Sequence, residues 1–213
     1  MRKARRCWWA ESDVLYHAYH DEEWGRPVTD DHRLYEKLVL EGFQAGLSWL
    51  TILRKRPRFR AAFAAFDPEL VARFGARDVR RLLADAGIVR HRGKIEAAIA
   101  NARCVLAAQR ELGSFASYVW SFAPDATRGP ASRAAIPTET AASRALARDL
   151  KTRGFRFVGP TTAYAFMQAM GLVNDHLRDC PTRRAAEADR ARLQRSRRST
   201  SQSGARPLSS RNA

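Results

Sequence analysis

Residues 154–162 read Gly-Phe-Arg-Phe-Val-Gly-Pro-Thr-Thr and lead into an apolar segment with helical spacing. A short apolar turn that ends in glycine, followed by proline at the first position of a helix, leaves the first backbone N–H groups of that helix without intrahelical partners. Such groups are suited to bind phosphate, which makes Gly159, Thr161 and Thr162 candidate phosphate-binding residues. The alternative is an ordinary connection between two helices.

A second connector of similar character lies upstream. Residues 87–94 read Gly-Ile-Val-Arg-His-Arg-Gly-Lys, so that two glycines enclose a cationic turn. Arg92 and Lys94 are therefore candidates for contacts with a phosphate backbone. An ordinary helix linkage explains this connector somewhat better than it explains the first one.

On either side of these connectors, glycine, proline and capping residues are spaced for helices rather than for strands. Helices are predicted to begin near Asp13, Asp30, Ser48, Asp67, Ala76, His91, Phe115, Ala142 and Pro160. Pro57 is expected to break or kink the third of them. Because alternation of apolar and polar residues is sustained nowhere, the predicted fold class is all-α.

The apolar content changes abruptly near residue 181. Upstream of it the chain can build a core, whereas Arg, Ser, Ala and Gln dominate downstream, a composition typical of disorder. We therefore predict one domain over residues 1–180 and a disordered basic tail over residues 181–213.

The formal net charge of +16 points to a polyanionic partner, of which nucleic acid is the commonest. The alternative is a basic tail joined to an ordinary domain. Residues 181–213 hold nine arginines against two acidic residues, so the tail carries +7 and the rest of the chain carries +9. The domain is thus basic in its own right, which favours nucleic acid.

The chain has three cysteines, Cys7, Cys104 and Cys180, too few and odd in number for a disulfide framework. Reduced thiols are typical of the cytosol and are free to bind metal. The N-terminus lacks the apolar run of a signal peptide, and no stretch approaches the roughly 18 apolar residues of a membrane helix. We expect a cytoplasmic protein that associates with the nucleoid when bound to DNA.

Glu41 occupies a position where an apolar residue is expected. Leu34, Leu38, Glu41 and Ala45 are spaced by four, three and four residues, the pattern of one buried helical stripe. A buried carboxylate must be paired with a cation, such as an arginine, or line a cavity. Trp49 follows across a glycine turn, so an acid and an aromatic ring could together hold a planar cationic ligand.

Four potential metal ligands lie at the two ends of the domain, and they are Cys7, His20, His176 and Cys180. Two thiolates and two imidazoles complete the closed tetrahedron that is typical of structural zinc. A metal there would join the two ends of the chain rather than activate water. The alternatives are a hydrogen bond from His20 to Asp21 and an idle Cys180 thiol.

Five motifs occur in the same order as in a known protein family. They are residues 16–25 (Tyr-His-Ala-Tyr-His-Asp-Glu-Glu-Trp-Gly), 40–49 (Leu-Glu-Gly-Phe-Gln-Ala-Gly-Leu-Ser-Trp), 86–95 (Ala-Gly-Ile-Val-Arg-His-Arg-Gly-Lys-Ile), 155–159 (Phe-Arg-Phe-Val-Gly) and 171–176 (Gly-Leu-Val-Asn-Asp-His). On these motifs the chain resembles the 3-methyladenine DNA glycosylase I family over about residues 5–180. One departure is Trp8, where the family leads us to expect a small residue.

The resemblance implies a helix–hairpin–helix DNA glycosylase fold with residues 154–162 as the hairpin, helical lobes around a base-binding cleft, and one structural zinc ion held by Cys7, His20, His176 and Cys180. It further implies that Glu41 and Tyr19 act on the extruded base as catalytic and recognition residues. Trp49 is expected to stack on that base, with Tyr16 and Trp9 as walls of the pocket.

The implied reaction is base excision from double-stranded DNA that contains alkylated adenine. The enzyme flips out 3-methyladenine, hydrolyses its glycosidic bond and leaves an abasic site. No lysine follows the hairpin closely, so a lyase step is not expected, and a monomer suits the task. Asp175 has two possible roles, as an activating carboxylate or as a brace for the metal site. A zinc-stabilised module that binds damaged DNA without cleaving it is the competing hypothesis.

Overall fold

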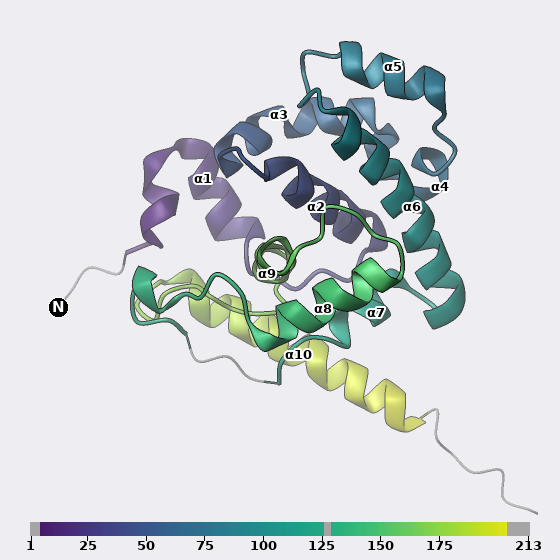
Figure 1. Ribbon diagram of the computed structural model, residues 1–213. Helices are drawn as coiled ribbons and strands as arrows, with labels where there is room; N and C mark the ends of the chain where they lie inside the picture. The colour runs from purple at the N-terminus through teal and green to yellow at the C-terminus, as the bar shows by residue number, and fades with distance from the viewer. Residues whose placement is uncertain (1–4, 126–128, 204–213) are drawn as a thin grey trace, which may run out of the picture.

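The computed structural model describes residues 5–125 and 129–203, with side chains described up to residue 196. Every regular element in these residues is helical, which confirms the predicted all-α class (Figure 1). In chain order the elements are the 3₁₀ turn η1 (Trp8–Ser12), α1 (Val14–Ala18), the π-helical turn η2 (Tyr19–Glu23), α2 (Asp31–Gln44), α3 (Trp49–Ala62), η3 (Ala64–Phe66), α4 (Pro68–Val71), α5 (Ala76–Ala84), α6 (Arg92–Leu112), α7 (Phe115–Trp120), η4 (Arg133–Ala135), α8 (Ala141–Thr152), α9 (Pro160–Ala169) and α10 (Thr182–Ser203).

Capping residues start five of the helices where the sequence predicts. Asp13, Asp30, Ser48, Asp67 and His91 each accept a hydrogen bond from a backbone N–H in the first turn of the helix that follows. Such bonds satisfy N–H groups that have no partner within the helix. Interactions between residues close in the sequence therefore define these helix starts.

Helix α2 lies at the centre of the molecule, between α6 and α9 and against α3 and α7 (Figure 1). Its residues 34–43 are all buried, so the helix is covered on every side rather than along one stripe. Phe43 meets the rings of Phe59 and Phe63 at centroid distances of 4.8 and 6.0 Å. The predicted stripe ends before Ala45, which is exposed because α2 stops at Gln44.

Helix α3 runs through Pro57, where the sequence predicts a break or a kink. Proline removes one backbone hydrogen bond and disturbs the preceding turn. Ile52, Arg56 and Phe59 are buried on either side of it. Burial of both halves of the helix against the same core offsets the local cost, so α3 does not end at this residue.

The prediction of a disordered tail from residue 181 is wrong for residues 182–203, which form α10. Ala186 and Arg190 are fully buried, and they are spaced by one helical turn. The Arg190 guanidinium donates to the carbonyl oxygens of Leu172, at 3.1 Å, and Pro124. An arginine that satisfies carbonyls of the domain leaves little apolar signal in the sequence. Residues 204–213 lie outside the described residues.

The turn between α8 and α9 is held by a side chain from α6. Asn101 is buried, and its amide donates to the Arg156 carbonyl at 3.0 Å and accepts from the Arg156 N–H at 2.8 Å. Phe155 and Val158 point into the core, while Phe157 is exposed. Asn101 therefore holds both the N–H and the carbonyl of Arg156, in the turn that precedes the start of α9 at Pro160.

In the described part of the chain, no helix combines the length and the apolar character needed to cross a bilayer.

Replacing Arg190 with leucine is expected to lower the free energy of unfolding by about 2–3 kcal/mol, because two carbonyls lose a charged donor. Arg192, two residues further along the same helix, is exposed and pairs only with Asp189 in the described residues. Arg192→Leu serves as the control and should leave stability unchanged in chemical denaturation. Equal stability of the two variants would contradict the docking of α10.

Candidate active site and metal centre

An aromatic cavity of about 360 Å³ opens between the N-terminal elements, α2 and α9. Its lining residues are Trp8, Trp9, Tyr16, Tyr19, Trp24, Glu41, Gln44, Trp49, Ile136, Ala165 and Gln168. All five residues predicted for catalysis and base binding are among them. The α2–α3 corner brings in Glu41 and Trp49, and segment 9–19 brings in the other three.

Glu41 is a buried carboxylate without a hydrogen-bond donor among the described residues, and it is only 6% exposed. Burial raises the pKa of Glu41 to about 7, although the nearby Lys37 ammonium opposes that rise. A carboxylate that lacks a partner in the protein and faces a cavity has its acceptor capacity free for a ligand. The arginine partner considered from the sequence does not exist in the described structure.

Charged side chains extend from behind the cavity towards the surface. Lys37 donates to the Tyr19 hydroxyl at 2.9 Å and lies 3.4 Å from a carboxylate oxygen of Glu23. Arg56 bridges Glu23 and Glu36, with both contacts at 2.6 Å. These groups are largely or fully buried, so each charge depends on its neighbours for compensation.

The aromatic residues that line the cavity contact one another edge-on or at a tilt. Trp9 meets Tyr16 edge-on at a centroid distance of 5.5 Å, and Tyr19 meets Trp49 at 5.5 Å. At the rim, the Arg133 guanidinium lies 5.5 Å from the exposed ring of Trp8. The unexpected tryptophan at position 8 therefore extends the cavity wall outward.

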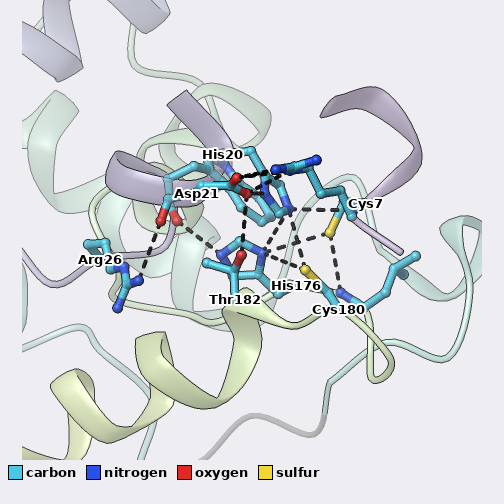
Figure 2. A network of polar contacts seen from close by, with 10 residues as sticks. Cys7, His20, Asp21, Arg26, His176, Cys180 and Thr182 are labelled. Atoms are coloured by element: carbon cyan, nitrogen blue, oxygen red, sulfur yellow. Dashed lines mark hydrogen bonds and ion pairs between the residues drawn. The ribbon is translucent and has the colours of Figure 1, made fainter. Parts of the chain in front are cut away.

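The four predicted metal ligands come together although they lie at opposite ends of the sequence. The potential ligand atoms of Cys7, His20, His176 and Cys180 all lie within 4.8 Å of one another and are buried (Figure 2). The Cys180 thiol lies 3.5 Å from His20 Nε2 and 3.6 Å from His176 Nδ1. The two imidazole nitrogens are 3.2 Å apart. This cluster can hold a metal ion.

The opposite nitrogen of each imidazole has an acceptor that sets its tautomer. His20 Nδ1 lies 2.7 Å from a carboxylate oxygen of Asp21 (Figure 2). His176 Nε2 lies 3.0 Å from the Trp24 carbonyl. Both acceptors require N–H on these atoms, so His20 Nε2 and His176 Nδ1 present lone pairs to the thiols. Hydrogen bonding to Arg6, opposed by slight burial and aided by His20, holds the pKa of Asp21 at about 2.

The sequence of this chain matches a known protein family. The family model for methyladenine glycosylases matches residues 9–184. DNA-3-methyladenine glycosylase 1 of Escherichia coli (strain K12) is 53% identical over 178 residues, which cover 82% of this chain and 95% of the relative. The DNA-3-methyladenine glycosylase of Haemophilus influenzae is 48% identical over 179 residues, covering 83% and 96%. This chain belongs to the methyladenine glycosylase family.

Solved structures agree with this assignment. A crystal structure of a 3-methyladenine DNA glycosylase I is 54% identical, has a TM-score of 0.80 and covers 83% of this chain and 98% of its own. The enzyme from Staphylococcus aureus, solved to explain 3-methyladenine recognition, is 38% identical with a TM-score of 0.80 and coverage of 83% and 95%. The resemblance drawn from the five sequence motifs is thereby confirmed.

Within this member of the family, the predicted DNA contacts divide into two groups. Thr161 and Arg92 are exposed, and Gly159 and Thr162 are half-buried at the start of α9. No side chain caps that helix start, so its first N–H groups remain available.

Lys94 requires a correction, since its side chain is buried and donates to the carbonyls of Phe43, at 2.9 Å, and Ala45, at 2.7 Å. Its ammonium binds the end of α2 rather than lying free at the surface.

Several lining residues were not predicted from the sequence. Gln168 reaches the cavity from α9 and donates to Asp175 at 2.8 Å, and Tyr164 donates to the same carboxylate. Asp175 itself does not line the cavity and contacts Gln168 from behind. Neither Gln168 nor Lys37, which lies behind the cavity, stands out in the sequence. No periodicity marks a polar residue whose surroundings are set by tertiary contacts.

Replacing Lys94 and Arg92 with methionine should have opposite consequences in this glycosylase. Lys94→Met should lower the free energy of unfolding by about 2 kcal/mol because two carbonyls at the end of α2 lose a charged donor. Arg92→Met should leave stability unchanged and reduce the slope of log K against log salt for DNA binding by about one. If Lys94→Met changed the salt slope by the same amount, Lys94 would be a phosphate contact and the correction above would be wrong.

Proposed function

We propose that this chain removes 3-methyladenine from alkylated double-stranded DNA by flipping the damaged nucleotide into the aromatic cavity and hydrolysing its glycosidic bond. Family membership establishes base-excision repair by a DNA glycosylase. The observation that carries the proposal for this chain is Glu41, a buried acceptor without a donor that lines the cavity together with Trp49 and Tyr19. A related 3-methyladenine DNA glycosylase I variant has been solved in complex with 3-methyladenine.

Selection rests on the charge of the lesion. Methylation at N3 makes the attached adenine cationic, whereas undamaged adenine is neutral. The faces of Trp49 and Tyr19 attract a planar cation more strongly than a neutral base. The Glu41 carboxylate adds Coulombic attraction and accepts a hydrogen bond from the base edge. Neutral adenine gains neither advantage, so the cost of extruding it from the stack is not offset.

The reaction itself needs little help from an acid. The C1′–N9 bond breaks with both electrons passing to the purine, which leaves as a neutral base. The sugar passes through an oxocarbenium-like state, and a water oxygen adds to C1′ while its proton goes to solvent. None of the described residues that line the cavity is a lysine, which supports hydrolysis that ends at an abasic site.

The turn between α8 and α9 serves in this proposal as the hairpin of a helix–hairpin–helix motif. Asn101 fixes its backbone, and the uncapped start of α9 presents N–H groups together with Gly159, Thr161 and Thr162. A rigid row of donors at the positive end of a helix binds a phosphate without reading sequence. This suits an enzyme that must examine every base.

A single structural zinc ion is the further element of the proposal. A tetrahedral zinc with the usual bond lengths has N···N edges of about 3.3 Å and N···S edges of about 3.6 Å. The corresponding distances here are 3.2 Å between nitrogens and 3.5, 3.6 and 3.8 Å between nitrogen and sulfur. Asp21 and the Trp24 carbonyl would orient the two imidazoles. All four positions are protein ligands, so the ion would stabilise the fold.

Glu41→Gln should reduce the release of 3-methyladenine by about 100-fold, because the replaced group loses its charge at the base edge. The assay is chromatography of bases released from methylated duplex DNA, with 7-methylguanine expected to stay in place. Wild-type activity should fall as the pH drops through about 7, the pKa of Glu41 raised by burial, since protonation removes the carboxylate. Glu41→Gln should lack this dependence.

Glu69→Gln, an exposed change on α4, is the matched control and should behave as the wild type. A wild-type protein that binds methylated DNA but releases no base would replace the enzyme with a damage-binding module.

Elemental analysis should find one zinc per chain, and Cys180→Ser should lose it together with a large drop in melting temperature. Cys104→Ser is the control because Cys104 lies outside the cluster, and it should retain both. Asp21→Asn should weaken zinc affinity by about 10- to 100-fold through loss of the partner of His20. Equal melting temperatures of the two cysteine variants, with no zinc in either, would rule the site out.

A further inference from the structure

Lys37 is a fully buried lysine in the middle of α2, one turn before Glu41. It does not line the cavity, and none of the roles proposed above uses it. Burying an ammonium is costly, and an apolar residue of similar volume at such a position is often neutral or stabilising. A charge at the centre of the core therefore calls for an explanation beyond packing.

The ammonium lies directly behind the aromatic wall of the cavity. It is 4.3 Å from the ring centroid of Trp49 and 4.5 Å from that of Tyr19. It donates to the Tyr19 hydroxyl at 2.9 Å. A hydroxyl that accepts this bond must direct its own proton elsewhere, so the Tyr19 O–H is left to donate away from Lys37.

Lys37 is also the cation that acts on Glu41. The other titratable and charged groups around this pair are Tyr16 from α1, Tyr19 and Glu23 from η2, Glu36 from α2 and Arg56 from α3. Arg56 is engaged by Glu23 and Glu36, whereas Glu41 has no ion pair among the described residues. Burial lowers the pKa of Lys37 to about 8, so its charge can be removed within an accessible pH range.

We propose that Lys37 is a positioning residue for the excision reaction, which orients the Tyr19 hydroxyl and maintains Glu41 as the carboxylate that selects a cationic purine. The inference rests on the proposed function, since it concerns the state of the same cavity. Lys37 acts through Tyr19 and Glu41 and does not touch the base. An apolar residue at position 37 would leave the cavity shape unchanged but favour the neutral form of Glu41.

The test is the single-turnover rate of 3-methyladenine release between about pH 5.5 and 9, measured for the wild type and Lys37→Met. The wild type should give a bell-shaped pH–rate profile, in which ionisation of Glu41 produces the acid limb and deprotonation of Lys37 produces the basic limb. Burial opposes ionisation of Glu23, but Lys37 and Arg56 hold the pKa of Glu23 below its usual value. Burial raises the pKa of Tyr19 well above its usual value. Neither residue therefore contributes a limb in this pH range. In Lys37→Met the acid limb should move up by at least about one pH unit, and the basic limb should disappear.

Two further variants separate charge from hydrogen bonding and from folding. Lys37→Gln keeps a donor for Tyr19 without the charge, so its acid limb should move as in Lys37→Met with a smaller loss of maximal rate. In a Glu41→Gln background, Lys37→Met should shift no acid limb, because the carboxylate whose charge Lys37 maintains is absent. Lys151→Met removes an exposed lysine and should reproduce the wild-type bell.

If the pH–rate profiles of Lys37→Met and Lys37→Gln kept both limbs in place, the inference would be overturned. A lowered melting temperature with unchanged limbs would overturn it as well, because it would indicate a structural role alone. A wild type that releases no base would instead refute the proposed function. Should Lys37→Met fail to fold, the same comparison is made with Lys37→Gln, and unshifted limbs there overturn the inference equally.

Discussion

The cost of burying charge around α2 is the constraint on which the rest of this structure depends. Within ten consecutive buried residues the helix carries Glu36, Lys37 and Glu41, and each needs compensation in a medium that does not supply water. Arg56 and Arg60 satisfy Glu36, while Glu23 and Tyr19 satisfy Lys37. These partners come from α3 and η2, so the position of both elements follows from the charges on α2.

Glu41 is the exception among these charges, and it is the residue on which the proposed function rests. Every other buried charge on α2 has a partner at hydrogen-bond or ion-pair distance, whereas Glu41 faces the aromatic cavity without one. The energetic deficit of an unpartnered carboxylate is what a cationic base can relieve on binding. In the proposed function, stability and recognition are thus linked, because the buried carboxylate that costs stability is also the group that would attract the lesion.

The closure of the chain ends supports this cavity from the other side. Trp9 lies two residues after Cys7, Tyr19 directly precedes His20, and Trp24 offers its carbonyl to His176. A cluster that fixes Cys7 and His20 therefore fixes cavity walls as well. Gly25, with a φ of +78°, turns the chain away, and a side chain there would lie 3.0 Å from the His176 ring. The proposed metal site and the base pocket share one wall.

The sequence alone determined most of the helices, the family and five residues of the cavity, because capping, periodicity and long motifs are local properties. Tertiary structure decided what happens to charges whose partners are distant in the chain. Lys94 binds carbonyls of α2 instead of phosphate, Arg190 docks a helix that composition indicates to be disordered, and Lys37 lies behind the aromatic wall. Lysine and arginine are solvated by default, and only the three-dimensional arrangement of acceptors shows which of them are buried.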